Sequence, residues 1–511
     1  MSLSTPARRP SFPHAPSPRR AAILFAISLL IVAVPEVGGS APPPDAPAKD
    51  GYFKVAKRGE GWAFIDPRGR DFFSLGINVI NPAEDAAVAP PKYDGLARHG
   101  GSREKWRAFT LGRLDAWNFN TIGAWSALRG RPYVLELSLS YSWIDVFGDD
   151  FETYVRRAAL ESRKRPDVAA DYPALAADRQ LIGYFTDNEL DWGWGYAWTG
   201  APGDLSLFEY YAGLGADDPG KKAWAAHLAA AHGGNFNDLR RVWDTDAGSE
   251  AALLAVKSIA PCGKDRWAEA GRVADGFLRT VAERYFAVTG GVMRKHLPNH
   301  LNLGTRLTPR FPTVVAEVAG RHVDVLSFNV YSRDLEFVKS EVTRLHRAGG
   351  RPVLVTEFAF PARRNLSGNA SKGYEQVEVP DDAARGREYA RFVGAVGEIP
   401  AVVGCHWFQY HDEPTCGRND GESVNFGFVD LADAVYDDLA RQAAGANAQL
   451  LRKRMPATAP SPPAVCPGPI RSSGITVVID GSSVRPPLHT DRLYPAQRSR
   501  PGHGIVPRLR R

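Results

Sequence analysis

Two glutamates stand where apolar runs end, and their types and positions suggest acid–base chemistry. The run Leu181–Glu189 begins as a buried strand would and finishes in Asn188 and Glu189. The run Pro352–Phe360 has Glu357 near its end. Two carboxyl groups facing each other across a cleft can divide the work of cleaving a glycosidic bond, because one protonates the leaving oxygen while the other attacks or activates water. Glu189 and Glu357 are therefore our candidate catalytic residues.

Aromatic residues crowd the segment that follows Glu189. Trp192, Trp194, Tyr196 and Trp198 all lie between positions 192 and 198. Large aromatic rings at such a site need either a packing reason or a ligand, and indoles stack well on the apolar faces of sugar rings. The pattern predicts a carbohydrate platform beside Glu189, with Trp192 as its first member.

Further polar and aromatic side chains end other apolar runs, which makes them candidates for contact with a sugar. The predicted substrate-binding set at these positions is Asn78, Trp125, Asn188, Trp192, Asn329, Tyr331 and Trp407. Taken singly, each type has an ordinary structural explanation. A strand-end glutamate is often solvated or salt-bridged, an indole can fill the top of a fold, and an amide can satisfy loop backbone. Their co-occurrence at strand ends favours a site.

The loop after the last apolar run is long and rich in hydrogen-bond donors and acceptors. It contains Gln409, Asp412, Arg418 and Glu422, whose polarity has no evident packing reason. We expect these four side chains to lie at the cleft and to contact the substrate.

Alternating strands and helices are needed to position these residues. The eight apolar runs are Phe72–Ile80, Thr121–Ser126, Tyr133–Ser140, Leu181–Glu189, Leu301–Leu307, Val323–Tyr331, Pro352–Phe360 and Val402–Asp412. The helical patterns are Arg103–Trp117, Phe151–Lys164, Pro312–Val318, Leu335–Ala348, Asp381–Glu398 and Ala432–Leu451. This alternation predicts an α/β fold, a (β/α)8 TIM barrel with its active site at the C-terminal ends of the strands. Glu189 and Glu357 would then face each other from strands four and seven.

One connection is too long for a simple barrel. About 110 residues (190–300) separate strands four and five, far more than a strand–helix loop needs. They contain the helical patterns Gly220–His232, Phe236–Trp243 and Arg266–Lys295. We expect a large helical insertion that caps the mouth of the barrel; a separate small domain is the alternative.

The two ends of the chain differ in composition from the body. Residues 1–41 place four arginines before the apolar run Ala21–Val34, which is shorter than the ~20 residues of a membrane span, so we predict a signal peptide. An uncleaved anchor is the alternative. A linker at 42–50, a catalytic domain at 51–455 and a disordered Pro/Arg-rich tail at 456–511 complete the predicted organisation. The protein is expected to be secreted or periplasmic, without stable membrane association after cleavage.

Charge and cysteine content exclude several classes of protein. The formal charge of +6 comes from the ends, because residues 1–41 contribute +3 and residues 452–511 contribute +9, which leaves −6 for the body. Such a body is not expected to bind nucleic acid. The four cysteines lack zinc-like spacing, so we predict no metal and no cofactor. Cys405 and Cys416 allow either a short disulfide or two free thiols.

Several motifs resemble known glycosidases. Asn188-Glu189 and Glu357 are similar to the acid/base and nucleophile motifs of clan A glycoside hydrolases. The segments Trp62–Pro67, Phe72–Gly76, Gly183–Glu189, His406–Pro414 and Gly417–Gly427 resemble, more narrowly, the glycoside hydrolase family 50 β-agarases and their relatives. The likeness spans roughly residues 51–450. The motif after the last strand is the part most specific to the agarase-like group.

The resemblance implies a retaining enzyme that uses Glu189 as the general acid and then base, and Glu357 as the nucleophile. We further expect Tyr331 to orient Glu357, Asn188 to bind the sugar 2-hydroxyl, and Trp407 to form the floor of the site. The pKa of Glu189 should be raised by its dry aromatic surroundings and by the charge of Glu357.

Two departures from the family pattern bear on the substrate. Family members often have a β-rich module before the barrel, whereas about ten residues separate the predicted signal from the barrel entry here. The long connection after Glu189 also bears on the sugar-binding subsites. The predicted function is hydrolysis of β-glycosidic bonds in a polysaccharide or oligosaccharide, most simply the β-galactosidic bonds of an algal galactan. The alternatives are a β-galactosidase, β-glucanase or mannanase of the same clan, and a non-catalytic carbohydrate-binding barrel.

Overall fold

The structure is a computed structural model that describes residues 50–85, 87–140, 144–192, 206–309, 311–418 and 420–456. The predicted signal peptide, nearly all of the predicted linker and all but the first residue of the predicted tail lie outside these residues, as do Trp194, Tyr196 and Trp198. Within the described ranges, no helix is both long enough and apolar enough to cross a membrane.

The described chain begins with a small antiparallel sheet. Strands β1 (Lys54–Arg58), β2 (Gly61–Ile65) and β3 (Asp71–Phe72) follow one another in that order. The turn from β2 to β3 is fixed by Asp66, whose carboxylate accepts hydrogen bonds from the backbone amides of Arg68 and Arg70, the local pairing that makes aspartate a common turn residue.

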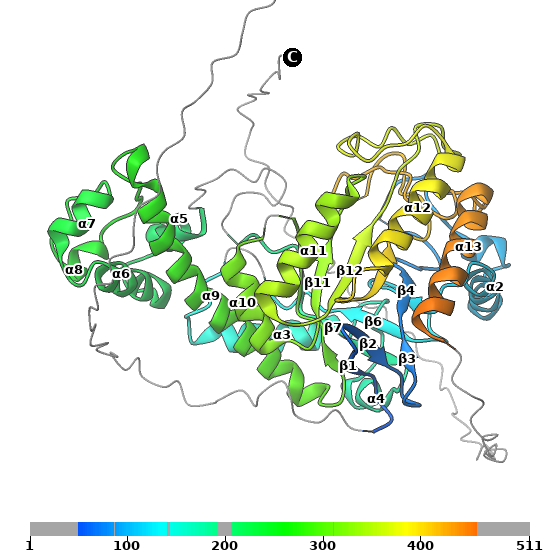
Figure 1. Ribbon diagram of the computed structural model, residues 1–511, viewed down its shortest axis with the longest axis horizontal. Coiled ribbons are helices and arrows are strands. Elements are labelled where there is room, and N and C mark those ends of the chain that lie inside the picture. The colour runs from blue at the N-terminus through cyan, green and yellow to red at the C-terminus, as the bar shows by residue number, and fades with distance from the viewer. Residues whose placement is uncertain are drawn as a thin grey trace, which may run out of the picture. The chain divides into compact units, whose positions relative to one another are not determined.

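A ten-stranded sheet with only parallel pairings forms the centre of the fold (Figure 1). Its strands, in chain order, are β4 (Ser74–Ile77), β5 (Thr121–Ile122), β6 (Tyr133–Glu136), β7 (Leu181–Phe185), β8 (Asp187–Asn188), β9 (Leu301–Asn302), β10 (Thr305–Leu307), β11 (Leu326–Asn329), β12 (Val353–Phe358) and β13 (Val402–Trp407). Their spatial order is β8-β10-β11-β12-β13-β4-β5-β6-β7-β9. Parallel pairing agrees with the prediction from strand–helix alternation.

The two end strands of this sheet, β8 and β9, are each nearly continuous in sequence with a strand at the opposite end. Only Thr186 separates β7 from β8, and two residues separate β9 from β10. Strand β7 pairs with β9 while β8 pairs with β10, and between these pairs the Thr186 amide donates to the Gly304 carbonyl at 2.8 Å. The sheet therefore curls round, an arrangement that is compatible with a barrel.

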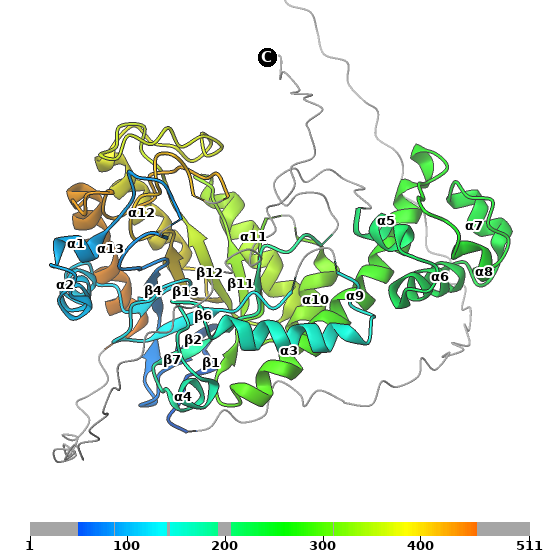
Figure 2. The same ribbon diagram turned by 180° about the vertical axis from the view of Figure 1, so that it is seen from behind.

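Helices follow most of the strands. They are α1 (Gly95–Arg98), α2 (Arg103–Ala116), α3 (Asp150–Ser162), α4 (Tyr172–Ala177), α10 (Thr313–His322), α11 (Leu335–Gly349), α12 (Asp382–Gly397) and α13 (Asp437–Arg454). Local signals set their ends. In α11, Asp334 caps the first amides and Gly350 ends the helix at a φ of 67°, a conformation that costs glycine little. Figures 1 and 2 show α13 beside both α12 and α2, so segments distant in sequence pack together.

The long connection between β8 and β9 is helical in its described part. It contains α5 (Ser206–Gly213), α6 (Pro219–Ala231), α7 (Phe236–Val242), α8 (Glu250–Leu253), the 3-10 turn η1 (Lys264–Arg266) and α9 (Trp267–His296). Helices α6, α7 and α9 coincide closely with the three predicted helical patterns. Helix α9 contacts α3 and α10 as well as α5 and α6, so it joins the helices of the connection to those beside the sheet.

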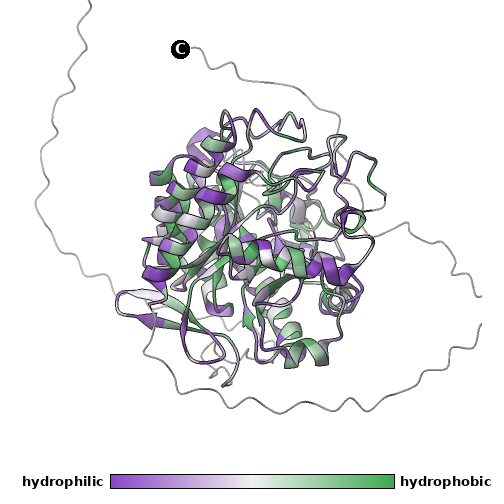
Figure 3. Ribbon diagram, turned by 90° about the vertical axis from the view of Figure 1, so that its right-hand side faces the viewer, coloured by the Kyte–Doolittle hydropathy of each residue, from purple (hydrophilic) through white to green (hydrophobic). Residues whose placement is uncertain are grey.

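The sheet separates two hydrophobic clusters. Along β12, Val353 and Val355 belong to a large cluster that includes the surrounding helices, whereas Leu354 belongs to a smaller one with Phe64, Phe185 and other strand residues. Alternate residues of a strand point to opposite faces, so a strand buried on both faces is apolar throughout. Figure 3 shows the matching pattern in the helices, which have mixed hydrophilic and hydrophobic faces.

The described cysteines are unpaired. Cys405 is buried in β13, and Cys262 and Cys416 are exposed. The alternative of a disulfide between Cys405 and Cys416 is therefore wrong, because a side chain buried within the sheet does not meet the exposed thiol of the loop.

Candidate active site

Both predicted catalytic glutamates lie at C-terminal strand ends. Glu189 directly follows β8, and Glu357 is the penultimate residue of β12. Strand β8 pairs with β10, β10 with β11, and β11 with β12, and all three pairings are parallel. The C-terminal ends of β8 and β12 therefore lie on the same side of the sheet. The amide of Glu189 still donates to the Arg306 carbonyl at 3.0 Å, although its φ of 49° turns the chain away from strand geometry. Such backbone is uncommon outside glycine and often marks a functional position.

The side-chain amide of Asn329 contacts Glu189. The Nδ2 group of Asn329 donates to Glu189 Oε1 at 2.8 Å and to Asn188 Oδ1 at 3.0 Å. The hydroxyl of Thr356 donates to Asn329 Oδ1 at 2.6 Å, which fixes the direction of the amide. Burial, followed by the negative charge of Glu357, raises the pKa of Glu189 to about 7. Glu189 therefore holds its proton more readily than an ordinary glutamate, as predicted.

A cation and a phenol surround Glu357. Its Oε1 forms an ion pair with Arg306 Nη2 at 2.8 Å, and its Oε2 accepts a hydrogen bond from the Tyr331 hydroxyl at 2.7 Å. Burial raises the pKa of Glu357, while the charge of Arg306 and the hydrogen bond from Tyr331 act in the opposite direction. Tyr331 thus contacts Glu357, and its role in orienting that carboxyl group stays a prediction.

Arg306 was not anticipated from the sequence. It lies in β10, has no exposed surface, and places its guanidinium 4.1 Å from the ring centroid of Trp125. A charged residue is almost never fully buried without a partner. The available signal is an arginine within the predicted strand Leu301–Leu307, which has leucine at three of its seven positions.

Charged residues of the loop after β13 act electrostatically on Glu189 and Glu357. Arg418 forms ion pairs with Glu413 at 3.0 Å, Asp420 at 2.6 Å and Glu422 at 2.6 Å. The Tyr374 hydroxyl donates to Glu422 at 2.7 Å. The charge of Glu422 acts to raise the pKa of both Glu189 and Glu357, so this side chain lies within electrostatic range of the pair. Arg418 and Glu422 are thus near the two glutamates, and their contact with substrate stays a prediction.

Two predicted tryptophan contacts differ from the structure. The indole of Trp407 is fully buried, donates to the Phe426 carbonyl at 2.7 Å, and packs edge-on against Phe358. Trp192 is buried against Tyr285 and Phe286 of α9. Neither ring has a free face for a sugar, so Trp407 does not form the floor of the site and Trp192 belongs to the core. Trp407 ends β13 and Trp192 follows β8 by four residues, but both side chains pack in the hydrophobic core.

Three predicted polar contacts are structural as well. Asn78 is fully buried and links the backbone of β12 to that of Ala124. Gln409 donates to the His411 carbonyl, and Asp412 accepts hydrogen bonds from Ser367, Tyr436 and Gly427. These side chains hold loops together instead of opening onto a cleft, because buried strand-end backbone needs polar partners.

No group of three or more potential metal-ligating side chains occurs in the described ranges. The arrangement instead offers a carboxylic acid with a pKa near neutrality close to a carboxylate that faces a cation. Such an inequivalent pair can donate a proton from one member and attack with the other.

The chain is similar in sequence to two curated proteins. No family model matches the chain. Two curated relatives come from Vibrio sp. (strain JT0107): β-agarase A, 28% identical over 491 residues and aligned with 78% of this chain, and β-agarase B, 24% identical over 479 residues and aligned with 77%. The chain spans about half the length of these relatives, because the alignments cover 47% of each.

Solved structures share the fold. The agarase AgWH50C superposes with a TM-score of 0.65 at 23% identity, covering 80% of this chain and 67% of that one. An exo-β-agarase gives a TM-score of 0.64 at 22% identity, covering 80% and 66%. BpGH50 gives 0.57 at 20% identity, covering 79% and 83%. The likeness extends over most of the described residues.

Proposed function

We propose that this protein is a glycoside hydrolase that cleaves β-glycosidic bonds, with the β-galactosidic bonds of an agarose-like algal galactan as its substrate. The observation behind the proposal is the inequivalent carboxyl pair, Glu189 and Glu357, at the C-terminal ends of β8 and β12. Two β-agarases align with more than three quarters of the chain and support the choice of galactan. The curled parallel sheet would be a closed (β/α)8 barrel, whose C-terminal strand ends form the active site.

The reaction would be a double displacement of the retaining, clan A type. Glu189 gives its proton to the glycosidic oxygen as that bond breaks, and the Glu357 carboxylate forms a bond to the anomeric carbon from the opposite face. Glu189, now ionised, removes a proton from water, and the water oxygen displaces Glu357. Arg306 and Tyr331 stabilise Glu357 while it is a carboxylate. Asn329 and Asn188, which are hydrogen-bonded to each other beside Glu189, would bind a hydroxyl of the sugar.

The helices between β8 and β9 would form an inserted cap that shapes the sugar-binding subsites. Tyr285 of α9 donates to the buried carboxylate of Asp187 at 2.6 Å, two residues before Glu189. Trp192, shortly after Glu189, packs on Phe286 of the same helix. The helical connection is therefore attached on both sides of the proposed acid.

The protein would act outside the cytoplasm. The basic residues before the apolar run at 21–34 are typical of a signal peptide. Expression in a bacterial host with Sec secretion, followed by N-terminal sequencing of the exported protein, should give a new terminus near residue 41. Full-length protein retained in the membrane fraction would instead support an anchor.

Hydrolysis assays on purified polysaccharides test the proposed activity. Full-length protein is incubated with agarose, a β-1,4-galactan, a β-mannan and a β-glucan, and reducing ends are measured beside the Glu357→Gln variant. We expect release from agarose that this substitution abolishes. Release from another polymer alone would replace agarose with that substrate. No release from any glycan would favour a carbohydrate-binding barrel.

A further inference from the structure

Arg306 is a buried cation that the hydrogen bonds of the described chain do not hold. Its side chain has no exposed surface, and none of its three guanidinium nitrogens makes a well-directed hydrogen bond with a described residue. Its ion-pair contact is with Glu357 Oε1, at 2.8 Å. Because a long side chain of this kind has many rotamers, something other than directed hydrogen bonds must fix its position.

The indole of Trp125 supplies that support. The guanidinium lies 4.1 Å from the Trp125 ring centroid and 5.4 Å from that of Phe185, well within the range of a favourable cation–π contact. Trp125 is itself held in an uncommon backbone conformation, with a φ of 55°. The plane of its indole therefore decides where the guanidinium sits.

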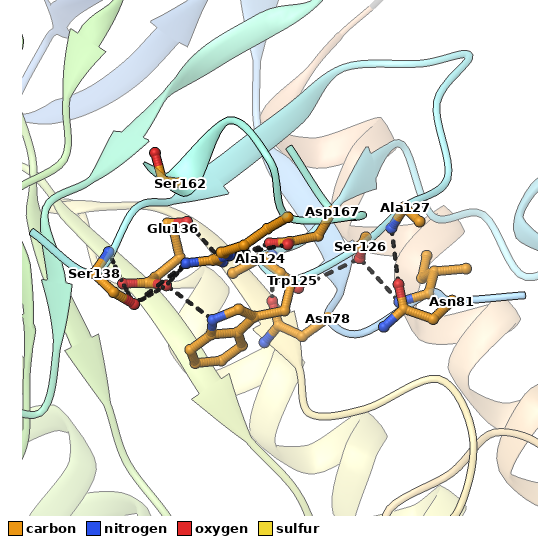
Figure 4. A network of polar contacts seen from close by, with 12 residues as sticks. Asn78, Asn81, Ala124, Trp125, Ser126, Ala127, Glu136, Ser138, Ser162 and Asp167 are labelled. Carbon is orange, nitrogen blue, oxygen red and sulfur yellow. Dashed lines mark hydrogen bonds and ion pairs between the residues drawn. The ribbon is translucent and has the colours of Figure 1, made fainter. Parts of the chain in front are cut away.

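A buried carboxylate fixes the plane of that indole. Trp125 Nε1 donates to Glu136 Oε2 at 2.9 Å, and Glu136, at the end of β6, has no exposed surface (Figure 4). The Ser138 amide donates to Glu136 Oε1 at 2.7 Å, and Arg165 forms an ion pair with Oε2 at 3.3 Å. A carboxylate with this many donors has one preferred orientation, so its hydrogen bond to the indole is directional.

We propose that Glu136 and Trp125 are positioning residues, which hold the Arg306 guanidinium against Glu357 and so keep the attacking carboxylate ionised and correctly oriented. The series runs from Glu136 through the Trp125 N–H, then across the indole face to Arg306, and ends at Glu357 Oε1. The expected effect on catalysis rests on the proposed glycosidase function. The expected effect of Trp125 on the ionisation of Glu357 does not depend on that function.

Other charged groups also act on the two ends of the series. Glu357 is affected by Tyr331, Glu422 and Arg418 in addition to Arg306, and it raises the pKa of Glu189. On the far side, the charge of Arg306 helps to lower the pKa of His406 in β13. Trp125→Phe leaves all of these groups in place and so isolates the position of Arg306. Glu136→Gln also removes a negative charge that acts on Asp187, but loss of a negative charge by itself lowers the pKa of a nearby carboxyl, so a rise in the pKa of Glu357 still reports a displaced Arg306.

The test uses Trp125→Phe, which keeps a ring under Arg306 but removes the N–H, and Glu136→Gln, which removes the charge with little change in shape. Matched controls are Trp243→Phe, whose indole N–H donates to His232 in the helical connection, and Glu341→Gln, which is paired with Arg344 on α11. Each protein is checked for cooperative thermal unfolding before it is assayed.

The first readout is the pH profile of kcat/KM. A displaced Arg306 stabilises the Glu357 carboxylate less, so the acid limb should move to higher pH by about one unit. At pH values below that limb kcat/KM should fall by about 10-fold, one decade for one pH unit, and the double variant should lose little beyond Trp125→Phe. The controls should keep the wild-type limb. A higher KM with unchanged kcat and an unmoved limb would mean that Trp125 only stacks on substrate and would overturn the proposal, as would equal losses at every pH.

A second readout needs no substrate. Protein with 13C-labelled glutamate carboxyls gives a Glu357 signal that is assigned by its absence in Glu357→Gln. Its titration midpoint should rise in Trp125→Phe and Glu136→Gln and stay unchanged in both controls. If wild-type protein cleaves no glycan but this midpoint moves, the proposed function fails and the positioning series stands. An unmoved midpoint overturns the series whatever the activity.

Discussion

Glu189 and Glu357 are both buried glutamates at strand ends, yet their surroundings differ. Glu189 accepts a hydrogen bond from the neutral amide of Asn329, which also donates to Asn188. Glu357 meets a cation, Arg306, and a phenol, Tyr331. Burial raises the pKa of both carboxyl groups. The partners therefore decide which carboxyl keeps the proton, because only one of them faces a full positive charge at contact distance.

Arg306 is the residue that separates the two environments. It comes from β10, between β8 and β11 in the sheet, and its charge acts to lower the pKa of both glutamates. It forms its ion pair, however, with Glu357. Direct contact with Arg306, rather than general proximity to it, therefore makes the two carboxyl groups inequivalent.

Removing either carboxyl should give the largest effect and should reveal the two roles. Glu357→Ala and Glu189→Ala should each lower kcat by about 10⁴-fold or more with a natural glycan. Azide should restore turnover of an activated aryl β-galactoside in both. We expect an α-glycosyl azide from Glu357→Ala, where azide replaces the nucleophile in a single displacement, and a β-glycosyl azide from Glu189→Ala. Proton NMR distinguishes the anomers.

The same NMR experiment on the wild type decides the stereochemistry. A β anomer formed first agrees with two displacements at the anomeric carbon. If the α anomer is formed first, the enzyme inverts, and Glu357 must be assigned as a base that activates water.

Replacing Arg306 should remove the inequivalence itself. In Arg306→Met the pKa of Glu357 should rise, because the opposing positive charge is lost and burial remains. The acid limb of kcat/KM should then move up by about 1–3 pH units, so activity measured below it falls by about 10- to 1000-fold. Arg306→Lys keeps a charge without the planar guanidinium and should be intermediate. A limb that stays in place in Arg306→Met would show that Tyr331 alone keeps Glu357 ionised.

Changing Asn329 should act on the other limb. Its amide donates to Glu189 and so lowers the pKa of that carboxyl, which burial and Glu357 raise to about 7. Wild-type kcat/KM should fall as pH rises through about 7, since Glu189 must be protonated. In Asn329→Ala this alkaline limb should move upward, with about a tenfold loss at the optimum from the missing sugar contact. Movement of the acid limb alone would contradict the assignment of Glu189 as the acid.

Asp412 is a third buried carboxyl group, and its hydrogen bonds hold loops together. Asp412 accepts hydrogen bonds from Ser367, Tyr436 and Gly427, and Asp412→Ala would leave those donors unpaired. We expect the free energy of unfolding to fall by about 2–4 kcal/mol, measured by urea denaturation, with KM and the two pH limbs of the folded fraction unchanged. A shifted limb would place Asp412 in the site after all.

Much of the framework was accessible from sequence because it is encoded locally. Periodic apolar residues predicted the helices of the long connection and those after β11, β12 and β13, and short apolar runs predicted parallel strands. Glu189 and Glu357 could be chosen because a carboxylate that interrupts such a run is conspicuous. Arg306 interrupts a run in the same way, but its partner is 51 positions away in sequence, so its meaning depended on which strands are neighbours.

The face to which each strand-end side chain points was decided only by the tertiary structure. In β13, His406 hydrogen-bonds with Ser74 of β4, whereas the next residue, Trp407, packs among Phe358, Tyr389 and Phe428 on the side of the helices. A shift of one residue moves a side chain from one face of a strand to the other. The sequence determined that an indole stands at this strand end; packing between sheet and helices determined that Trp125, not Trp407, lies against the arginine that pairs with Glu357.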